Sequence, residues 1–284
     1  MQTSAPDQAH GSIASDEPLT VKGWTPRNYS GDFKGAVTLR DALAQSINSV
    51  AVRLYLDVGK RRVVSAARRL GITSDMLDGP SLALGTSEVT PLELTNAYVP
   101  FANGGAATAP FVVRRVVASG GRVLLQSKPR LSLGVIEARA VAAMSDMLQH
   151  TVTAGTGRAA AIARHPAAGK TGTSQDFRDA WFVGFTGHLV GGVWIGNDNG
   201  RAMHSVVGGA LPAKIWREIM LAAHADKAPK SLARSKLVVD AGEAAPGLPA
   251  PMPHRPAHSV RAAAATPDRI GEQFVRRALN ESFN

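Results

Sequence analysis

The chain has 284 residues, of which 44% are hydrophobic and 19% charged, a balance typical of a folded globular protein and not of a disordered one. It contains no cysteine, which excludes disulfide bonds and thiolate metal sites. The formal net charge of +10 permits an anionic partner, but few aromatic residues accompany the basic ones, so we expect no nucleic-acid partner. No apolar run reaches the ~18 residues of a membrane span. The opening residues also lack the apolar centre of a signal peptide, and we expect neither feature in this sequence.

Composition divides the chain into three regions. Residues 1–20 are expected to form an irregular lead, and residues 21–226 to form the folded part. Residues 227–284 are rich in proline and alanine and are expected to be a linker and tail. In the turn-rich start of the folded part, we expect Trp24 and Tyr29 to anchor the chain.

Helical signals follow. Thr38, with Asp41 three residues later, forms a capping box that predicts a helix running toward Ser46. A second apolar helical run follows at 50–56. Residues 59–71, "GKRRVVSAARRLG", predict an amphipathic helix whose basic face is solvated.

The middle of the chain combines helices with a hairpin. Thr90 and Glu93 form a second capping signal, and the helix they open is expected to end by Gly104. Two β-branched runs across Ser119-Gly120-Gly121 predict a hairpin within 111–128. Apolar spacing then predicts a helix over 136–154.

The period changes near residue 167. Three short runs, "AGKTGTS", "DAWFVGFTG" and "LVGGVWIGND", predict strands separated by turns. A helix is expected after Pro212. Five prolines within 245–257 exclude helix and central strand there, and the last residues, "DRIGEQFVRRALNESF", predict a short terminal helix.

Two short motifs carry side chains suited to acyl transfer. Ser46 and Asn48 form a Ser-x-Asn triplet at the expected junction of two helices, and Lys170 begins "KTGT" on an expected strand. Serine acyl-transfer enzymes place a Ser-x-x-Lys helix, a Ser-x-Asn loop and a Lys-Thr-Gly strand around one cleft. Each motif alone is common, but the two motifs in this order point more specifically to a serine acyl-transfer enzyme.

The residue types suit specific roles in that cleft. Lys170 would place a cation near a substrate carboxylate, and Thr173 would offer the same carboxylate a hydroxyl. Gly172 would let the substrate backbone approach the strand, since it has no Cβ. Ser46 would pass a proton to a leaving amine, and the amide of Asn48 can donate and accept.

Beyond these motifs, the sequence resembles the C-terminal transpeptidase module of the class A, bifunctional penicillin-binding proteins of the 1A type. The resemblance rests on residues 23–54, 83–105, 153–160, 167–186 and 193–198. It implies an α/β fold of the α+β type, related to serine β-lactamases: an antiparallel sheet flanked by helices. Residues 21–226 would be a partial transpeptidase domain, incomplete at its N-terminal side.

The resemblance also implies a function. The family cross-links peptidoglycan by forming an acyl-enzyme with D-Ala-D-Ala stem peptides, and β-lactams acylate the same serine. Ser46, Asn48 and Lys170 would be catalytic, and Thr171, Gly172 and Thr173 would bind substrate. The implied partners are stem peptides on lipid-linked glycan strands, β-lactams and an upstream glycosyltransferase domain. The implied location is periplasmic, on the outer side of the inner membrane.

One expected motif is absent. No serine in the chain is followed three residues later by lysine; the nearest approach is an arginine in that place, as Arg234 stands after Ser231. We therefore expect a fragment of a longer protein, inactive alone, in which apolar side chains such as Val50, Val52, Leu54 and Leu56 lack a partner. A pseudo-enzyme that binds stem peptide or penicillin without reacting, and a D,D-carboxypeptidase or β-lactamase relative, are the alternatives. His150, His165, His188 and His204 are scattered along the sequence without ligand spacing, and we expect neither a metal nor a cofactor.

Overall fold

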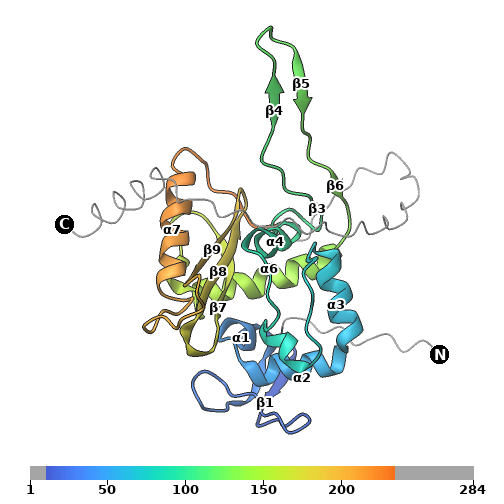
Figure 1. Cartoon of the computed structure of the whole chain (residues 1–284). Coiled ribbons are helices and arrows are strands. Elements are labelled where there is room, and N and C mark those ends of the chain that lie inside the picture. Colours follow the sequence, from blue (N-terminus) through green and yellow to red (C-terminus); the bar gives the residue numbers. More distant parts are fainter. Residues whose placement is uncertain (1–10, 234–284) are drawn as a thin grey trace. The chain divides into compact units, whose positions relative to one another are not determined.

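The central feature of the fold is a three-stranded antiparallel sheet. A computed structural model describes residues 11–233 and is shown in Figure 1. The strands are β7 (Ala167–Thr173), β8 (Asp179–Thr186) and β9 (Val190–Gly196), in the spatial order β7-β8-β9. They coincide with the three predicted runs, and β7 is an edge strand. The predicted fold class, an antiparallel sheet flanked by helices, is confirmed.

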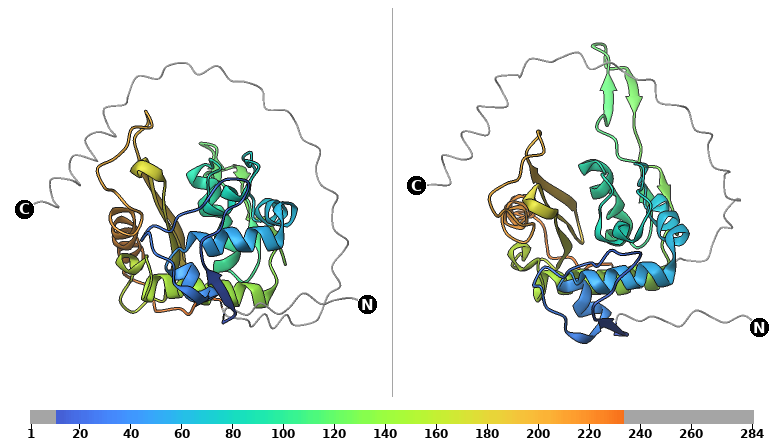
Figure 2. Two further views of the ribbon diagram at one scale, coloured as in Figure 1. Left: turned by 90° about the horizontal axis from the view of Figure 1, so that it is seen from below. Right: turned by 60° about the horizontal axis from the view of Figure 1, so that its bottom comes forward.

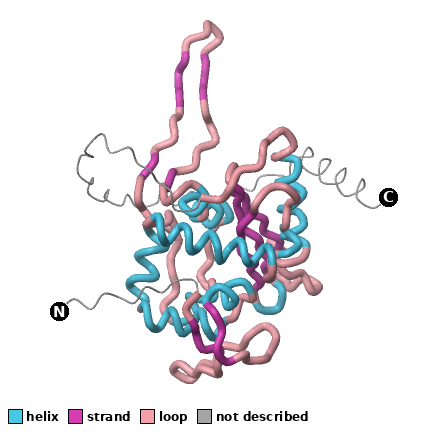
Figure 3. The backbone as a smooth tube through the Cα atoms, turned by 180° about the vertical axis from the view of Figure 1, so that it is seen from behind, coloured by secondary structure: helices cyan, strands magenta, loops and turns pink. Residues whose placement is uncertain are grey.

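Helices cover both faces of the sheet, as the view in Figure 3 shows. Neighbouring glycines in β9 reveal the two layers, because successive residues of a strand point to opposite faces. A Cβ on Gly191 would meet Trp216, whereas a Cβ on Gly192 would meet Thr95. One layer is therefore α7 (Leu211–Ala223), and the other contains α4 (Pro91–Ala97), α5 (Val99–Ala102) and α6 (Ala138–Thr153).

Each layer has its own core. On the α7 side, the rings of Phe182 and Trp216 meet edge to face at 5.1 Å, and both side chains are fully buried. On the α6 side, Phe185 packs with Leu148. Burial of aromatic rings of this size contributes most to the stability of such layers.

A helical region precedes the sheet in the chain. It begins with a two-stranded antiparallel pair, β1 (Ile13–Asp16) and β2 (Gly35–Thr38), and β1 lies in the lead that was expected to be irregular. Three helices follow: α1 (Leu39–Ala44), α2 (Asn48–Val58) and α3 (Lys60–Arg69).

Two predictions for this region are wrong. Val50 and Val52 are buried, with 2% and 0% of their surface exposed, because Val50 packs with Ala42 and Ile47 within the chain itself. The expectation that they lack a partner does not hold for them, although Leu56 is exposed. Tyr29 is also exposed and anchors nothing; its buried neighbour is Asn28.

The remaining elements are short. The predicted hairpin is present and extends away from the body of the described chain in Figures 1 and 2. These short elements are η1 (Pro80–Leu84), β3 (Ala107–Thr108), β4 (Arg115–Val117), β5 (Val123–Gln126), β6 (Leu131–Ser132), η2 (Arg158–Ala160) and η3 (Gln175–Phe177).

No helix in the part of the chain that the structure describes has the length and apolar character needed to cross a membrane. The predicted terminal helix and the proline-rich segment 245–257 lie outside the described residues.

Candidate active site

The junction between α1 and α2 fixes the position of Ser46. Ser46 follows the end of α1 with a φ of +57°, in the left-handed region that serine seldom adopts. The Ser46 N–H donates to Leu43 O at 3.1 Å, and the Ile47 N–H donates to Ala42 O at 2.9 Å. These two bonds form a Schellman motif, in which glycine normally holds the position of Ser46. The backbone, and not a flexible loop, therefore aims the hydroxyl.

Lys170 meets Ser46 from the sheet. Its Nζ donates to the Oγ of Ser46 at 2.8 Å and to the backbone oxygen of Thr171 at 2.9 Å. Burial of the ammonium group lowers the pKa of Lys170 to about 8. Lys170 can therefore gain or lose its proton at a pH not far above neutral.

The other residues of the "KTGT" strand have different neighbours. The Oγ1 atoms of Thr171 and Thr156 lie 2.7 Å apart, and the Oγ1 of Thr173 accepts from the Gly208 N–H at 3.1 Å. A Cβ on Gly172 would lie 3.3 Å from the Cβ of Trp181. The absence of a side chain at Gly172 thus also serves packing within the sheet.

Thr156 reaches the site because the loop after α6 packs against the end of α1. The Thr156 N–H donates to Ala44 O at 2.9 Å, and a Cβ on Gly155 would overlap that same carbonyl group. Only glycine fits this close approach. Thr156 therefore contacts two elements: its N–H binds the end of α1, and its hydroxyl contacts Thr171 on β7.

Asn48 is placed differently from Ser46. It is the first residue of α2, and its Nδ2 donates to Arg27 O at 2.8 Å. The structure thus brings Ser46 and Lys170 into direct contact but does not join Asn48 to them by a hydrogen bond. The catalytic role of each of these residues stays a prediction.

A buried polar network that the sequence reasoning missed holds the start of α2. The Oδ1 of Asn28 accepts from the N–H groups of Asn48 (3.0 Å) and Ser49 (3.3 Å), and so supplies the cap that Ile47 does not provide. The Nδ2 of Asn28 donates to Asp16 at 2.8 Å, and the Ser49 hydroxyl donates to the same carboxylate. No sequence motif indicates this network, because its members come from separate segments.

Asp16 is the charged centre of that network and is 1% exposed. Burial alone would raise its pKa, but hydrogen bonds from Ser49, from Asn28 and from the Lys34 N–H (2.9 Å) together lower it. The carboxylate is therefore held ionised beneath the Ser-x-Asn motif.

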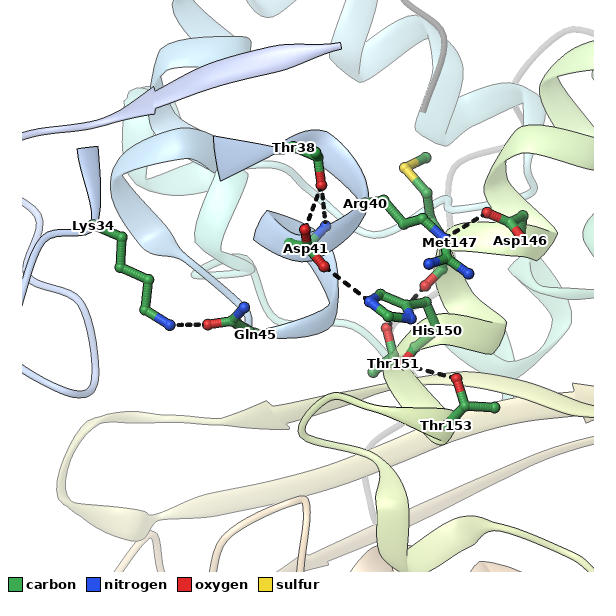
Figure 4. Close-up of polar contacts among 10 residues, drawn as sticks. All are labelled: Lys34, Thr38, Arg40, Asp41, Gln45, Asp146, Met147, His150, Thr151 and Thr153. Atoms are coloured by element: carbon green, nitrogen blue, oxygen red, sulfur yellow. Dashed lines mark hydrogen bonds and ion pairs between the residues drawn. The ribbon is translucent and has the colours of Figure 1, made fainter. Parts of the chain in front are cut away.

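Two polar contacts brace α1 against α6, as Figure 4 shows. The Nε2 of His150 lies 2.9 Å from Asp41 Oδ1, and the Nε of Arg40 donates to Asp146 Oδ2 at 2.8 Å. Asp41 also accepts from the Thr38 hydroxyl, which confirms the predicted capping pair. α1, whose end sets the position of Ser46, is thus held at its start by the Thr38 cap and along one side by α6.

The histidines are less scattered than the sequence suggested. The rings of His165 and His224 lie 4.6 Å apart, and His188 lies within 6.3 Å of His165. Even so, the described residues include no group of three or more His, Asp or Glu side chains arranged to hold a metal ion.

Comparisons with known proteins identify the family and the fold. Residues 4–221 match the family model for the penicillin-binding protein transpeptidase domain. The penicillin-binding protein 1A of Aquifex aeolicus is 42% identical over 207 residues, and that of Neisseria meningitidis serogroup A is 37% identical over 222 residues. These alignments cover 72% and 73% of this chain but only 28% of each relative, so the chain spans little more than a quarter of the curated relatives it matches.

Solved structures show the same fold. The penicillin-binding protein 1A of Haemophilus influenzae superposes with a TM-score of 0.71 at 24% identity, over 78% of this chain and 40% of that one. The PonA1 protein of Mycobacterium tuberculosis, solved in complex with penicillin V, gives a TM-score of 0.70 at 26% identity, over 79% and 66%.

Proposed function

The chain belongs to the penicillin-binding protein transpeptidase family, and on that premise we propose that it forms the substrate-binding side of a peptidoglycan D,D-transpeptidase site. The observation that carries the proposal is the 2.8 Å contact between Lys170 Nζ and Ser46 Oγ. It joins the Ser-x-Asn motif to the "KTGT" motif, from positions 124 residues apart in the sequence.

In this proposal the residues have separate tasks. The ammonium of Lys170, with the hydroxyls of Thr171 and Thr173, attracts the C-terminal carboxylate of a D-Ala-D-Ala stem peptide. Gly172 leaves room for the peptide backbone beside β7. The amide of Asn48 holds the peptide on the opposite side, after its bond to Arg27 is exchanged for one to substrate.

Ser46 serves as a proton relay and not as the nucleophile. The attacking serine gives its hydroxyl proton to its paired lysine as its Oγ adds to the carbonyl carbon of the penultimate D-Ala. The C–N bond then breaks, and the terminal D-Ala leaves as an amine that must gain a proton. The Ser46 hydroxyl can give that proton and regain one from Lys170, whose pKa of about 8 suits exchange near neutral pH. An acceptor amine from a stem peptide on a neighbouring glycan strand then displaces the serine and completes the cross-link.

The attacking serine and its lysine are proposed to come from polypeptide outside these 284 residues, because the chain has no Ser-x-x-Lys sequence. From the family we also propose three partners: β-lactams, lipid-linked glycan strands and a glycosyltransferase domain. The proposed location is the extracytoplasmic side of the membrane. The absence of that motif also favours a second candidate, a protein that binds stem peptide or penicillin without reacting.

The test is the intact mass of the chain after incubation with a penicillin, together with its affinity for a D-Ala-D-Ala peptide. We expect an unchanged mass and saturable peptide binding that the substitution Lys170→Met abolishes. A stoichiometric acyl adduct would show that a serine of this chain is the nucleophile, and digestion would identify it. Loss of the adduct in Ser46→Ala would then overturn the relay assignment.

A third measurement separates the two candidates. Addition of a polypeptide that carries the family's Ser-x-x-Lys segment should restore acylation if this chain is one part of an enzyme. A binding protein that never reacts would bind the peptide equally well and gain no acylation under any such condition.

A further inference from the structure

The hairpin that projects from the body of the described chain exposes an unusual combination of side chains. We call residues 109–134 the hairpin arm. Every residue in it is exposed except Ala118 and Ser127, which are half-buried, and Val112 (99%) and Leu133 (80%) present nearly their whole surface to solvent. Its other exposed large apolar residues are Phe111, Val113, Val116, Val117, Val123, Leu124, Leu125 and Leu131.

The arm is well formed in spite of this exposure. Arg115 pairs with Gln126 and Val116 with Leu125, and the turn closes through Ala118 N–H to Arg122 O at 2.8 Å. An isolated two-stranded hairpin is marginally stable in water at best, and exposed apolar surface of this extent marks interaction sites. The arm is therefore suited to being covered by a partner.

The charge of the arm restricts the kind of partner. The arm contains no aspartate or glutamate, and none of its cations has an ion pair within residues 11–233. Its cations are Arg114, Arg115, Arg122, Lys128 and Arg130. A second copy of the arm would be repelled, whereas an acidic partner would be attracted and oriented.

The position of the apolar residues favours a protein partner over a membrane. A hairpin that enters a bilayer surface needs large apolar or aromatic side chains at its tip. The tip here is Ala118-Ser119-Gly120-Gly121, and the apolar side chains lie along the two strands instead. Four of the five cations are arginines, which pair with carboxylates through two parallel hydrogen bonds and are enriched in protein interfaces.

The backbone of the arm offers a way to bind. β4 and β5 form a two-stranded sheet, so that each has one edge free of strand pairing among the described residues. Open edges accept an extended segment as an added strand, with main-chain hydrogen bonds giving affinity and side chains giving specificity. We propose that the hairpin arm is a docking surface for an acidic protein segment that adds a strand to β4 or β5.

The probe for this proposal is a short blocked peptide of alternating glutamate and valine, tested on the full chain. Its counterpart with lysine in place of glutamate, and vesicles of phosphatidylglycerol, are the comparisons. We expect the acidic peptide to bind, to slow hydrogen exchange of the amides between Arg115 and Gln126, and to weaken as salt is added. The lysine peptide and the vesicles should not bind.

Two matched variants separate docking from simple charge attraction. Arg115→Glu with Arg122→Glu should weaken binding of the acidic peptide by about tenfold or more, the loss expected for one or more charged pairs. Arg61→Glu with Arg69→Glu makes the same change of net charge on the exposed face of α3 and should leave the affinity nearly unchanged. All four side chains are exposed, so both variants should fold.

Three results would overturn the proposal. The first is an equal loss of affinity in both double variants, which would mean attraction by net charge alone. The second is binding to the anionic vesicles that depends on Arg115 and Arg122, which would make the arm a membrane contact. The third is an unchanged rate of amide exchange in the arm at saturating acidic peptide.

Discussion

The Nζ of Lys170 donates a 2.8 Å hydrogen bond to the Oγ of Ser46, a residue whose backbone is held in the left-handed region by a Schellman motif. The cation is placed by the edge strand β7, and the hydroxyl by the end of α1. Neither element alone creates the site. The geometry of the site depends on how the α1–α2 junction packs against β7.

Binding of a D-Ala-D-Ala peptide should weaken as the pH rises through about 8. Burial lowers the pKa of Lys170 to about 8, so the cation that attracts the carboxylate is present below that pH and lost above it. The affinity should be measured across this range, and the titration of Lys170 followed by NMR. Lys60→Met, at the exposed ion pair with Asp78, should retain the inflection, whereas Lys170→Met should show no peptide binding at any pH in this range. An affinity that stays constant up to about pH 10 would contradict the assignment.

Replacing Asn28 with alanine should lower the free energy of unfolding by about 1–3 kcal/mol, because Asp16 loses a buried donor and α2 loses its cap. Urea denaturation measures the change. The control is Asn48→Ala, which removes only the exposed bond to Arg27 and should cost no more than about 0.5 kcal/mol. Equal losses in the two variants would show that the buried network is not what holds α2.

The substitution Asn28→Asp should be worse at neutral pH than in acid. It replaces the donor to Asp16 with a second carboxylate, and like charges at this distance raise the pKa of the pair. A raised pKa in the folded state means that stability is lost as the pH rises. The difference from the unmodified chain should therefore be larger at about pH 7 than at about pH 4. The opposite order would exclude repulsion as the cause.

The substitution Gly208→Ala should destabilise the chain by about 1–3 kcal/mol and weaken peptide binding. A Cβ at this position would overlap the carbonyl oxygens of Trp181 and Gly172 and would lie 2.9 Å from Gly172 N. Because these are backbone atoms, β7 itself must move. Gly120→Ala is the matched control, since a Cβ there meets nothing within 4 Å. A melting temperature unchanged in both variants would mean that the 208 loop adapts freely.

Glu93 should make stability fall in acid. Burial by itself raises the pKa of Glu93, but donors from Ser74 and Thr73 outweigh it and lower the pKa to about 2. A lowered pKa contributes stability that is complete above about pH 4.5 and is lost as the pH falls toward 2. Acid unfolding of Glu93→Gln should therefore be less steep in this range than that of Glu88→Gln, the control. Identical acid transitions would show that Glu93 contributes nothing.

Much of the fold could be predicted from local patterns. The caps at Thr38 and Thr90 begin α1 and α4 where expected, because a cap depends on residues three positions apart. The alternating runs around "KTGT" form the three predicted strands, and the turn after Ser119 closes the predicted hairpin. Lys170 and Ser46 meet as the motif pairing indicated.

The parts that could not be predicted depend on contacts between distant segments. Asn28 caps a helix that starts at residue 48 and is itself bound to Asp16, and no sequence rule links an acid in a short strand to an amide in a turn. Tyr29 looked like the anchor because aromatic residues are usually buried, yet the polar Asn28 is the buried one, since its amide satisfies backbone groups. His165 and His224 are brought together only by the end of α7.

The order of the three sheet strands along the chain indicates at what stage of folding the binding site can form. β7, β8 and β9 are consecutive and joined by short turns, so their pairing requires little loop closure and should form early in folding. The bond from Lys170 to Ser46 closes a loop of 124 residues and should form late. A chain caught partway through folding would then have its sheet but no binding site. Pulse-labelling hydrogen exchange should find the amides of β8 protected before those at the α1–α2 junction.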